Sequence, residues 1–182
     1  MNKKTKSVAE WKKLVEDFQK PNRKAAIWQL VNTLGPLTGI WTALYFVYPI
    51  SWLFAIPLAI LGGLFLVRAF IIFHDCGHGS FFRSKKANDV LGFITGMLTF
   101  TPYHHWKWEH SVHHASTGDL SRRGMGDIWT LTVKEYLEST RWKRFTYRLT
   151  RNPFVLFLIG PLFLFFVLQR FCAKSANQRH AA

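Results

Sequence analysis

The feature that most constrains this chain is a stretch of 43 residues, 25–67, that contains no Asp, Glu, Lys or Arg. The hydrocarbon core of a bilayer is about 30 Å thick and takes about 20 apolar residues per helix. The stretch therefore has room for two membrane-spanning helices joined by a short turn. Because Pro and Ser interrupt helices, the Tyr48–Ser51 segment is the expected turn, and we predict spans over about 27–48 and 52–73.

A second uncharged stretch, 152–169, predicts a third span over about 153–171. A further apolar stretch, Val90–Tyr103, has only 14 residues, which is short for a span. It fits either a re-entrant or interfacial segment or a helix packed on the other spans. The expected fold class is therefore an all-α integral membrane protein, with about three transmembrane helices plus cytoplasmic and interfacial helices.

The positions of the charges predict the topology. The chain has 24 Lys and Arg against 10 Asp and Glu, a formal net charge of +14, and 20 of the basic residues lie either before Ala25 or between Arg83 and Arg151. Cytoplasmic segments of membrane proteins are enriched in Lys and Arg. We therefore expect the N-terminus and the central segment on the cytoplasmic side of a membrane, most simply a bacterial plasma membrane. Topology accounts for the charge, so we expect no nucleic-acid partner.

The N-terminal segment carries apolar residues at helical spacing between its lysines. They are Val8, Trp11, Leu14, Val15 and Phe18. This pattern predicts an amphipathic helix on the membrane surface or, alternatively, a helix packed on the cytoplasmic part of the protein.

Seven of the eight histidines fall between His74 and His114. His74 and His78 are four residues apart, so both imidazoles lie on one face of a helix. His110, His113 and His114 crowd one side of a helix in the same way. Imidazole binds zinc, copper, iron or nickel. A structural zinc takes four ligands, so these five histidines indicate two metals, or one metal with further histidines around it.

These motifs resemble those of the membrane fatty acid desaturases. The segment His74–Phe82, HDCGHGSFF, looks like their first histidine box, and His110–His114, HSVHH, is similar to the second. The flanking segments Trp106–Glu109 and Gly126–Thr130 also resemble the acyl-lipid branch of that family. The resemblance covers roughly residues 20–171.

The resemblance implies a membrane oxidoreductase of fatty acid and lipid metabolism. Such an enzyme holds a non-haem di-iron centre with histidines and uses dioxygen to introduce a cis double bond into an acyl chain. The iron ligands implied by the resemblance are His74, His78, His110, His113 and His114. His105 is an additional candidate, although it lies five positions before His110. Glu109 lies four residues from both His105 and His113, so it can orient an imidazole or simply face solvent.

Two polar features accompany the first box. Arg68, inside the second expected span, is predicted to snorkel to the interface or to pair near the site. Asp75 and Cys76 lie between the two histidines, and helical geometry predicts that they point elsewhere, with Cys76 as a small buried residue.

The chain contains no flavin or haem motif, and the resemblance implies ferredoxin, flavodoxin or a cytochrome as electron donor. Basic residues of the central segment could attract such acidic carriers. They include Arg122, Arg123, Lys143 and Arg144. Anionic lipid headgroups account for the same charges, and we favour this second interpretation.

The family also has a third histidine box after a fourth span, and this sequence has neither. We therefore expect a truncated desaturase domain over residues 1–171, followed by a short polar tail over 172–182, and an incomplete, inactive site in this chain by itself. Two alternatives stay open: a related histidine-box hydroxylase or ketolase of the carotenoid type, and a non-catalytic membrane remnant that binds metal.

The three-span arrangement makes a prediction about sidedness. A reporter fused after Ala182 is expected on the non-cytoplasmic side, because three crossings separate it from a cytoplasmic N-terminus. Alkaline phosphatase and green fluorescent protein fusions measure this, with a fusion after Arg151 as the cytoplasmic control. Two fusions that report the same side would contradict the third span.

Overall fold

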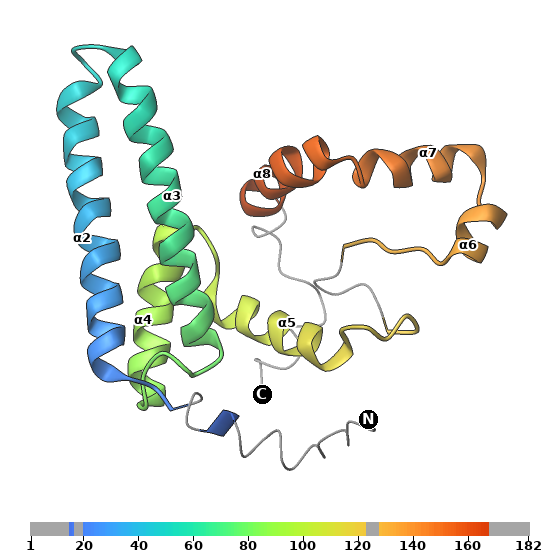
Figure 1. Ribbon diagram of the computed structural model, residues 1–182, viewed down its shortest axis with the longest axis horizontal. Coiled ribbons are helices and arrows are strands. Elements are labelled where there is room, and N and C mark those ends of the chain that lie inside the picture. Colours follow the sequence, from blue (N-terminus) through green and yellow to red (C-terminus); the bar gives the residue numbers. More distant parts are fainter. Residues whose placement is uncertain (1–14, 17–19, 123–127, 168–182) are drawn as a thin grey trace, which may run out of the picture. The chain divides into compact units, whose positions relative to one another are not determined.

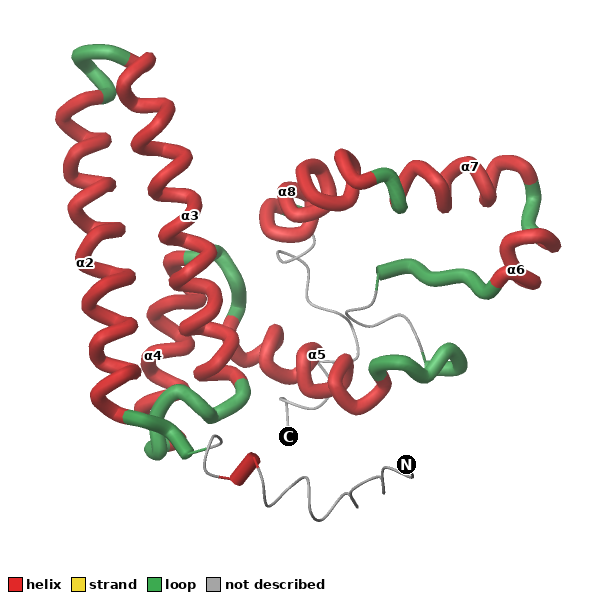
Figure 2. Tube along the Cα trace, in the orientation of Figure 1, coloured by secondary structure: helices red, strands yellow, loops and turns green. Residues whose placement is uncertain are grey.

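The computed structural model describes residues 15–16, 20–122 and 128–167, and the regular elements among them are all helical (Figures 1 and 2). The predicted all-α class is therefore confirmed over this part of the chain. The main elements are α2 (Arg23–Val47), α3 (Trp52–Gly77), α4 (Lys85–Leu98), α5 (Tyr103–Ser116), α6 (Val133–Glu138), α7 (Arg141–Thr150), η2 (Val155–Ile159) and α8 (Gly160–Phe166). The chain divides into two compact units, residues 1–99 and 100–182, which are described separately.

In the first unit, α2 and α3 form an antiparallel hairpin (Figure 1). Both helices are long and apolar enough to cross a membrane, with 25 and 26 residues. At about 1.5 Å per residue, each exceeds the roughly 30 Å of the hydrocarbon core. The first two predicted spans thus correspond to helices, although α2 begins earlier and α3 ends later than expected. The extension of α3 to Gly77 matters most, because it places His74 on the last turns of an apolar helix.

The early start of α2 has a local cause. The Asn22 side chain caps the helix, since its Oδ1 accepts hydrogen bonds from the backbone N–H groups of Lys24 at 3.0 Å and Ala25 at 3.2 Å. An Asn at this position satisfies N–H groups that have no partner within the helix. The helix therefore begins four residues before the apolar stretch expected to cross the membrane.

Small side chains recur along one buried face of α3. The buried residues of α3 include four that recur every seven positions: Ala55, Gly62, Ala69 and Cys76. On α2, the buried residues are Ala26, Thr33, Leu37 and Ile40. Small residues allow helix backbones to approach closely in a membrane, and a seven-residue repeat keeps them on one seam of a left-handed crossing. Gly62 of this repeat faces Ile40 on α2, so the repeat contributes to the close approach of the two helices.

A polar contact joins the same two helices. The Arg68 guanidinium donates a hydrogen bond of 2.6 Å to Asn32 Oδ1 on α2, and it lies over the Phe65 ring at 5.3 Å from the centroid. Of the two roles predicted for Arg68, the structure shows pairing, and the partner is a residue of the neighbouring apolar helix. A charged group in an apolar helix requires such a partner.

α4 packs against α3 (Figure 1). It is N-capped by Ser84, whose hydroxyl accepts from the Ala87 backbone N–H at 3.3 Å. Of the two alternatives for the apolar stretch 90–103, a helix packed on another helix is the one observed. The expected boundaries were wrong, because α4 begins at Lys85 and the stretch is divided by a short link before α5.

In the second unit, the region expected to form the third span contains η2, a π-helical segment, and continues as α8. Proline at position 161 has no N–H to donate, which helps explain the irregular hydrogen bonding here. Residues 168–171 lie outside the described part, so the third span stays a prediction. The N-terminal amphipathic helix, except Val15, and the tail 172–182 likewise lie outside it.

Two adjacent glycines of α3 provide a test of the helix contact. A Cβ at Gly62 would lie 3.4 Å from Ile40 Cγ2, whereas a Cβ at Gly63 meets nothing within 4 Å. Gly62→Ile is expected to destabilise the hairpin by about 1–3 kcal/mol through overpacking, while Gly63→Ile should have little effect. Thermal unfolding of the detergent-purified protein measures the difference. Equal loss in both variants would contradict the proposed close contact.

Candidate metal centre

The first histidine pair lies at the C-terminal end of α3. The Nε2 atoms of His74 and His78 are 3.3 Å apart, and the two ring centroids are separated by 4.5 Å. His74 is half-buried and His78 is exposed. The spacing of four residues thus brings the two imidazoles together, as predicted.

The end of α3 is shaped by a glycine. Gly79 has a φ of +70°, in the left-handed region that residues with a Cβ rarely adopt. The Ser80 N–H donates to the Asp75 carbonyl and the Gly79 N–H to the Cys76 carbonyl, each at 3.0 Å. These two bonds form a Schellman motif. The motif ends the helix immediately after the histidine pair and leaves His78 at the C-cap.

Asp75 has a role that the sequence argument missed. Its Oδ1 lies 3.2 Å from His74 Nδ1, whereas helical geometry predicted that it would point away from the histidines. A carboxylate on Nδ1 leaves Nε2 available as a ligand and fixes the orientation of the ring. The sequence signal for this role is the position of Asp75 directly after His74, a candidate ligand. Cys76 is fully buried, as predicted.

The last residue of the first box, Phe82, is fastened to α4 by Asn88. This side chain accepts a hydrogen bond from the Phe82 backbone N–H and donates one to the Phe82 carbonyl, both at 2.8 Å. Asn88 is only 1% exposed. A buried amide that satisfies both backbone groups of one residue holds that residue in place, so the position of the first box depends on α4 as well as α3.

The second histidine pair lies on α5. His110 and His114 have their Nε2 atoms 3.0 Å apart. The Trp106 indole stacks on His110, with centroids 4.3 Å apart and an angle of 17° between the planes. This stacking restricts the orientation of the His110 ring. Trp106 was not among the predicted contacts of His110, although the two residues are four positions apart in the sequence.

His113 is close to this pair but makes different contacts. Its ring centroid lies 6.1 Å from that of His110 and 5.7 Å from that of His114. Its Nε2 lies 3.3 Å from the Thr117 hydroxyl. The predicted crowding of three histidines on one side of the helix is therefore observed, while only His110 and His114 bring their Nε2 atoms to a common point.

The remaining histidines of α5 lie apart from this pair. The α5 helix is continuous through residues 105–110, and His105 Nε2 contacts Glu109 Oε1 at 3.4 Å. The His105 side chain is only 11% exposed. Of the two roles predicted for Glu109, contact with an imidazole is the one observed, and its partner is His105. His104 is exposed and packs edge-on against Tyr103.

The donor geometry within each pair fits a metal ion. Metal–imidazole bonds are about 2.0–2.1 Å long in zinc sites, so two nitrogens on one ion lie roughly 3.0 Å apart at a right angle and roughly 3.4 Å apart at a tetrahedral angle. The observed Nε2 separations of 3.3 Å and 3.0 Å fall in this range. Each pair therefore supplies two adjacent coordination positions.

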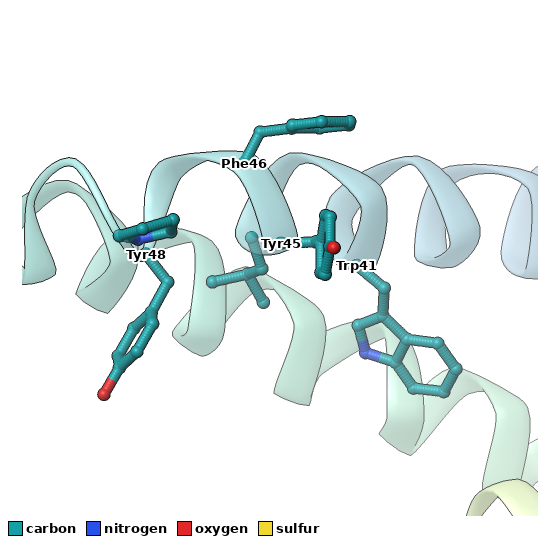
Figure 3. A pocket seen from close by; sticks show the side chains of 6 residues that line it. Trp41, Tyr45, Phe46 and Tyr48 are labelled. Atoms are coloured by element: carbon teal, nitrogen blue, oxygen red, sulfur yellow. The ribbon is translucent and has the colours of Figure 1, made fainter.

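An open hollow of about 640 Å³ lies at the other end of the hairpin, near the turn between α2 and α3 (Figure 3). Aromatic side chains dominate its lining, which comprises Trp41, Leu44, Tyr45, Phe46, Tyr48 and Pro49. Aromatic residues of this kind concentrate at membrane–water interfaces. The hollow is remote from His74 and His78, because nearly the whole length of α3 separates them.

Comparison with known sequences identifies the class of protein. Residues 50–181 match the sequence profile of the family described as "Fatty acid desaturase". The chain belongs to the fatty acid desaturase family, and the resemblance seen in the two histidine boxes is thereby confirmed. No solved structure gives a significant match to this chain.

Individual relatives carry related descriptions. A "Fatty acid desaturase" of Bacillus subtilis (strain 168) is 45% identical over 167 residues, which is 92% of this chain and 47% of the relative. An "sn-1 oleoyl-lipid 12-desaturase" of Synechocystis sp. is 30% identical over 171 residues, 90% of this chain and 45% of the relative. An "sn-1 acyl-lipid omega-3 desaturase (ferredoxin)" of the same organism is 35% identical over 121 residues, 64% of this chain and 31% of the relative. The chain thus spans about half the length of the first two curated relatives, and less of the third.

The contact between His74 and Asp75 predicts an effect on metal binding. Asp75→Ala is expected to weaken binding about 10–100-fold, because loss of the group that orients a ligand histidine commonly costs this much. Asp75→Asn keeps an acceptor oxygen and should lose less. Titration of the purified protein with Co²⁺, followed by visible absorption, measures the affinity, with Asp119→Asn as the control. Unchanged affinity in Asp75→Ala would show that the contact does not support a metal ligand.

Proposed function

We propose that this chain acts in a membrane fatty acid desaturase that introduces a cis double bond into the acyl chain of a membrane lipid, with dioxygen as oxidant. The observation that carries the proposal is the pair of Nε2 atoms at ligand spacing in each histidine box. Because the chain belongs to the desaturase family, we interpret these pairs as iron ligands. Imidazole suits iron, and removal of hydrogen from an unactivated carbon requires an oxidant that no amino-acid side chain provides.

We propose that the two boxes contribute to one non-haem di-iron centre. Its ligands in this chain would be His74, His78, His110, His113 and His114. Iron bound there would supply the activation of dioxygen, and the protein supplies the position of the ligands and the exclusion of water. His113 would join the ligands by exchanging its Thr117 contact, 3.3 Å in the present structure, for the metal.

The residues around the ligands have separate tasks in this proposal. Asp75 would hold the proton of His74 on Nδ1, so that Nε2 faces the metal, and Trp106 would keep the His110 ring in its plane. Glu109 would act through His105 rather than through a ligand, given their contact at 3.4 Å. The apolar helices α2 and α3 would hold the site at a membrane surface, where an acyl chain can reach it from the lipid phase.

An electron donor completes the proposed reaction, because reduction of dioxygen to water with removal of two substrate hydrogens requires two further electrons. One relative is described as an omega-3 desaturase that uses ferredoxin, which supports a carrier of this class for the present chain. Flavodoxin or a cytochrome could perform the same task. We propose a plasma-membrane location, with both histidine boxes on the cytoplasmic side, where soluble carriers have access.

A chimaera tests the function in the context of a longer desaturase. The present chain replaces the region that it matches in the Bacillus subtilis relative, and the product is expressed in a bacterial strain without desaturase activity. Mass spectrometry of the membrane lipids is expected to show new double bonds. His78→Ala and His114→Ala should abolish them and lower the iron content of the purified chimaera, because each removes one ligand of a pair.

The matched control is His104→Ala, since His104 is exposed and lies outside both pairs. It should retain double-bond formation and iron. A chimaera that accumulates in the membrane and binds iron but forms no double bond would refute the desaturase proposal, and hydroxylated lipids would indicate a hydroxylase. Iron content unaffected by either ligand substitution would refute the proposed metal centre.

A further inference from the structure

The helix α7 has an exposed apolar face that the proposed metal centre does not use. Trp142, Phe145 and Leu149 follow one another at i, i+3 and i+7, so they form one stripe along the helix. Their exposed fractions are 72%, 53% and 48%. The rings of Trp142 and Phe145 stack with centroids 5.5 Å apart. The stripe is therefore a continuous apolar ridge, and we call it the α7 stripe.

The other side of α7 packs within its own unit. The Tyr147 ring contacts those of Trp129 and Tyr136, with centroids 5.4 and 5.8 Å apart. Arg151, one residue beyond the helix, donates a hydrogen bond of 2.7 Å to Thr130 Oγ1 and lies over the Tyr147 ring. These contacts set the rotation of α7 about its axis. The α7 stripe is consequently turned away from the residues on which the helix packs.

The charges of α7 are all positive. Its sequence, RWKRFTYRLT, contains four basic residues and no acidic one. At 100° per residue, Arg141 and Arg148 lie along one edge of the stripe, whereas Lys143 lies about 100° from Trp142, on the side of Tyr147. All three are exposed. Long basic side chains can extend from such an edge while their stems cover apolar surface.

The chain continues from α7 directly into an apolar segment. Only Arg151 and Asn152 separate the helix from the stretch that contains η2 and α8. Phe154 and Phe157 in this stretch are 64% and 75% exposed, and α7 contacts η2. The stripe is therefore held close to a segment that is itself rich in exposed apolar side chains.

We propose that α7 lies in the interface of an anionic phospholipid bilayer, with the α7 stripe at the boundary of the acyl chains and its flanking cations at the lipid phosphates. An apolar face with Trp and Phe, bordered by Lys and Arg, is the pattern of helices that lie in a membrane surface. An acidic protein would satisfy the cations, but covering the stripe would also require a matching apolar surface on that protein. The lipid interface satisfies both, which decides between the two occupants.

Spin labels on the full chain in liposomes test this placement. Single cysteines replace Trp142, Phe145 or Lys143 in a Cys76→Ala, Cys172→Ala background and carry a nitroxide. Power saturation then compares collisions with oxygen, which concentrates in the acyl region, and with a water-soluble nickel chelate. In liposomes with phosphatidylglycerol, the ratio of oxygen to nickel collisions is expected to be higher at positions 142 and 145 than at 143. The difference should decrease in phosphatidylcholine alone.

Charge variants test the anionic component. Arg141→Gln and Arg148→Gln are each expected to shift the docked-to-undocked equilibrium of α7 by about fivefold, because one cation near an anionic surface contributes about 1 kcal/mol. Lys134→Gln is the control, since Lys134 lies on α6 and pairs with Glu138 at 4.0 Å. It should leave the collision ratios at positions 142 and 145 unchanged.

Three results would overturn the proposal. Equal nickel collisions at all labelled positions would place the stripe in water, whereas protection from both reagents would show that it packs on protein. Protection that appears only when an acidic ferredoxin is added would assign the surface to an electron carrier. Each result is independent of iron content and of double-bond formation, so failure here is distinguishable from failure of the desaturase proposal.

Discussion

The close approach of α2 and α3 governs the first unit, because α3 carries both the apolar segment and the first histidine pair. A Cβ added at Gly62 would already be in van der Waals contact with Ile40, and Arg68 donates a hydrogen bond to Asn32 between the same two helices. Arg68 lies six residues before His74, so its contact with Asn32 anchors α3 close to the first histidine pair. Packing within the apolar hairpin thus determines the orientation of a polar site at its end.

Each histidine pair combines a ligand spacing that is inherent in the helix with neighbours that orient its rings. On α3 the neighbours are the Asp75 carboxylate and the Schellman motif at Gly79, and on α5 the neighbour is the Trp106 indole. The two boxes therefore use different physical means, hydrogen bonding in one and ring stacking in the other. In the proposed metal centre, orientation of the rings before metal binding would reduce the entropy lost on binding, which is the benefit of preorganisation.

Several features were accessible from the sequence because they depend on local periodicity. The uncharged stretch predicted the α2–α3 hairpin, and the spacing of four residues predicted both imidazole pairs. Features that depend on neighbouring groups were not predicted. Asp75 was expected to point away from the histidines, although its carboxylate reaches His74 Nδ1. The boundaries expected for the apolar stretch 90–103 were wrong, because Ser84 caps α4 and the helix begins at Lys85, five residues earlier.

The sequence by itself determined the helical class, the apolar hairpin, the family and the histidine spacing, since each follows from residue types at short separations along the chain. Only the tertiary structure decided which residues meet across elements. It joined Arg68 to Asn32, fastened the last residue of the first box through Asn88, and turned the α7 stripe outward by packing Tyr147 inward. The physical reason is that a helical pattern defines a face, whereas the rotation and neighbours of that face depend on packing against segments distant in the sequence.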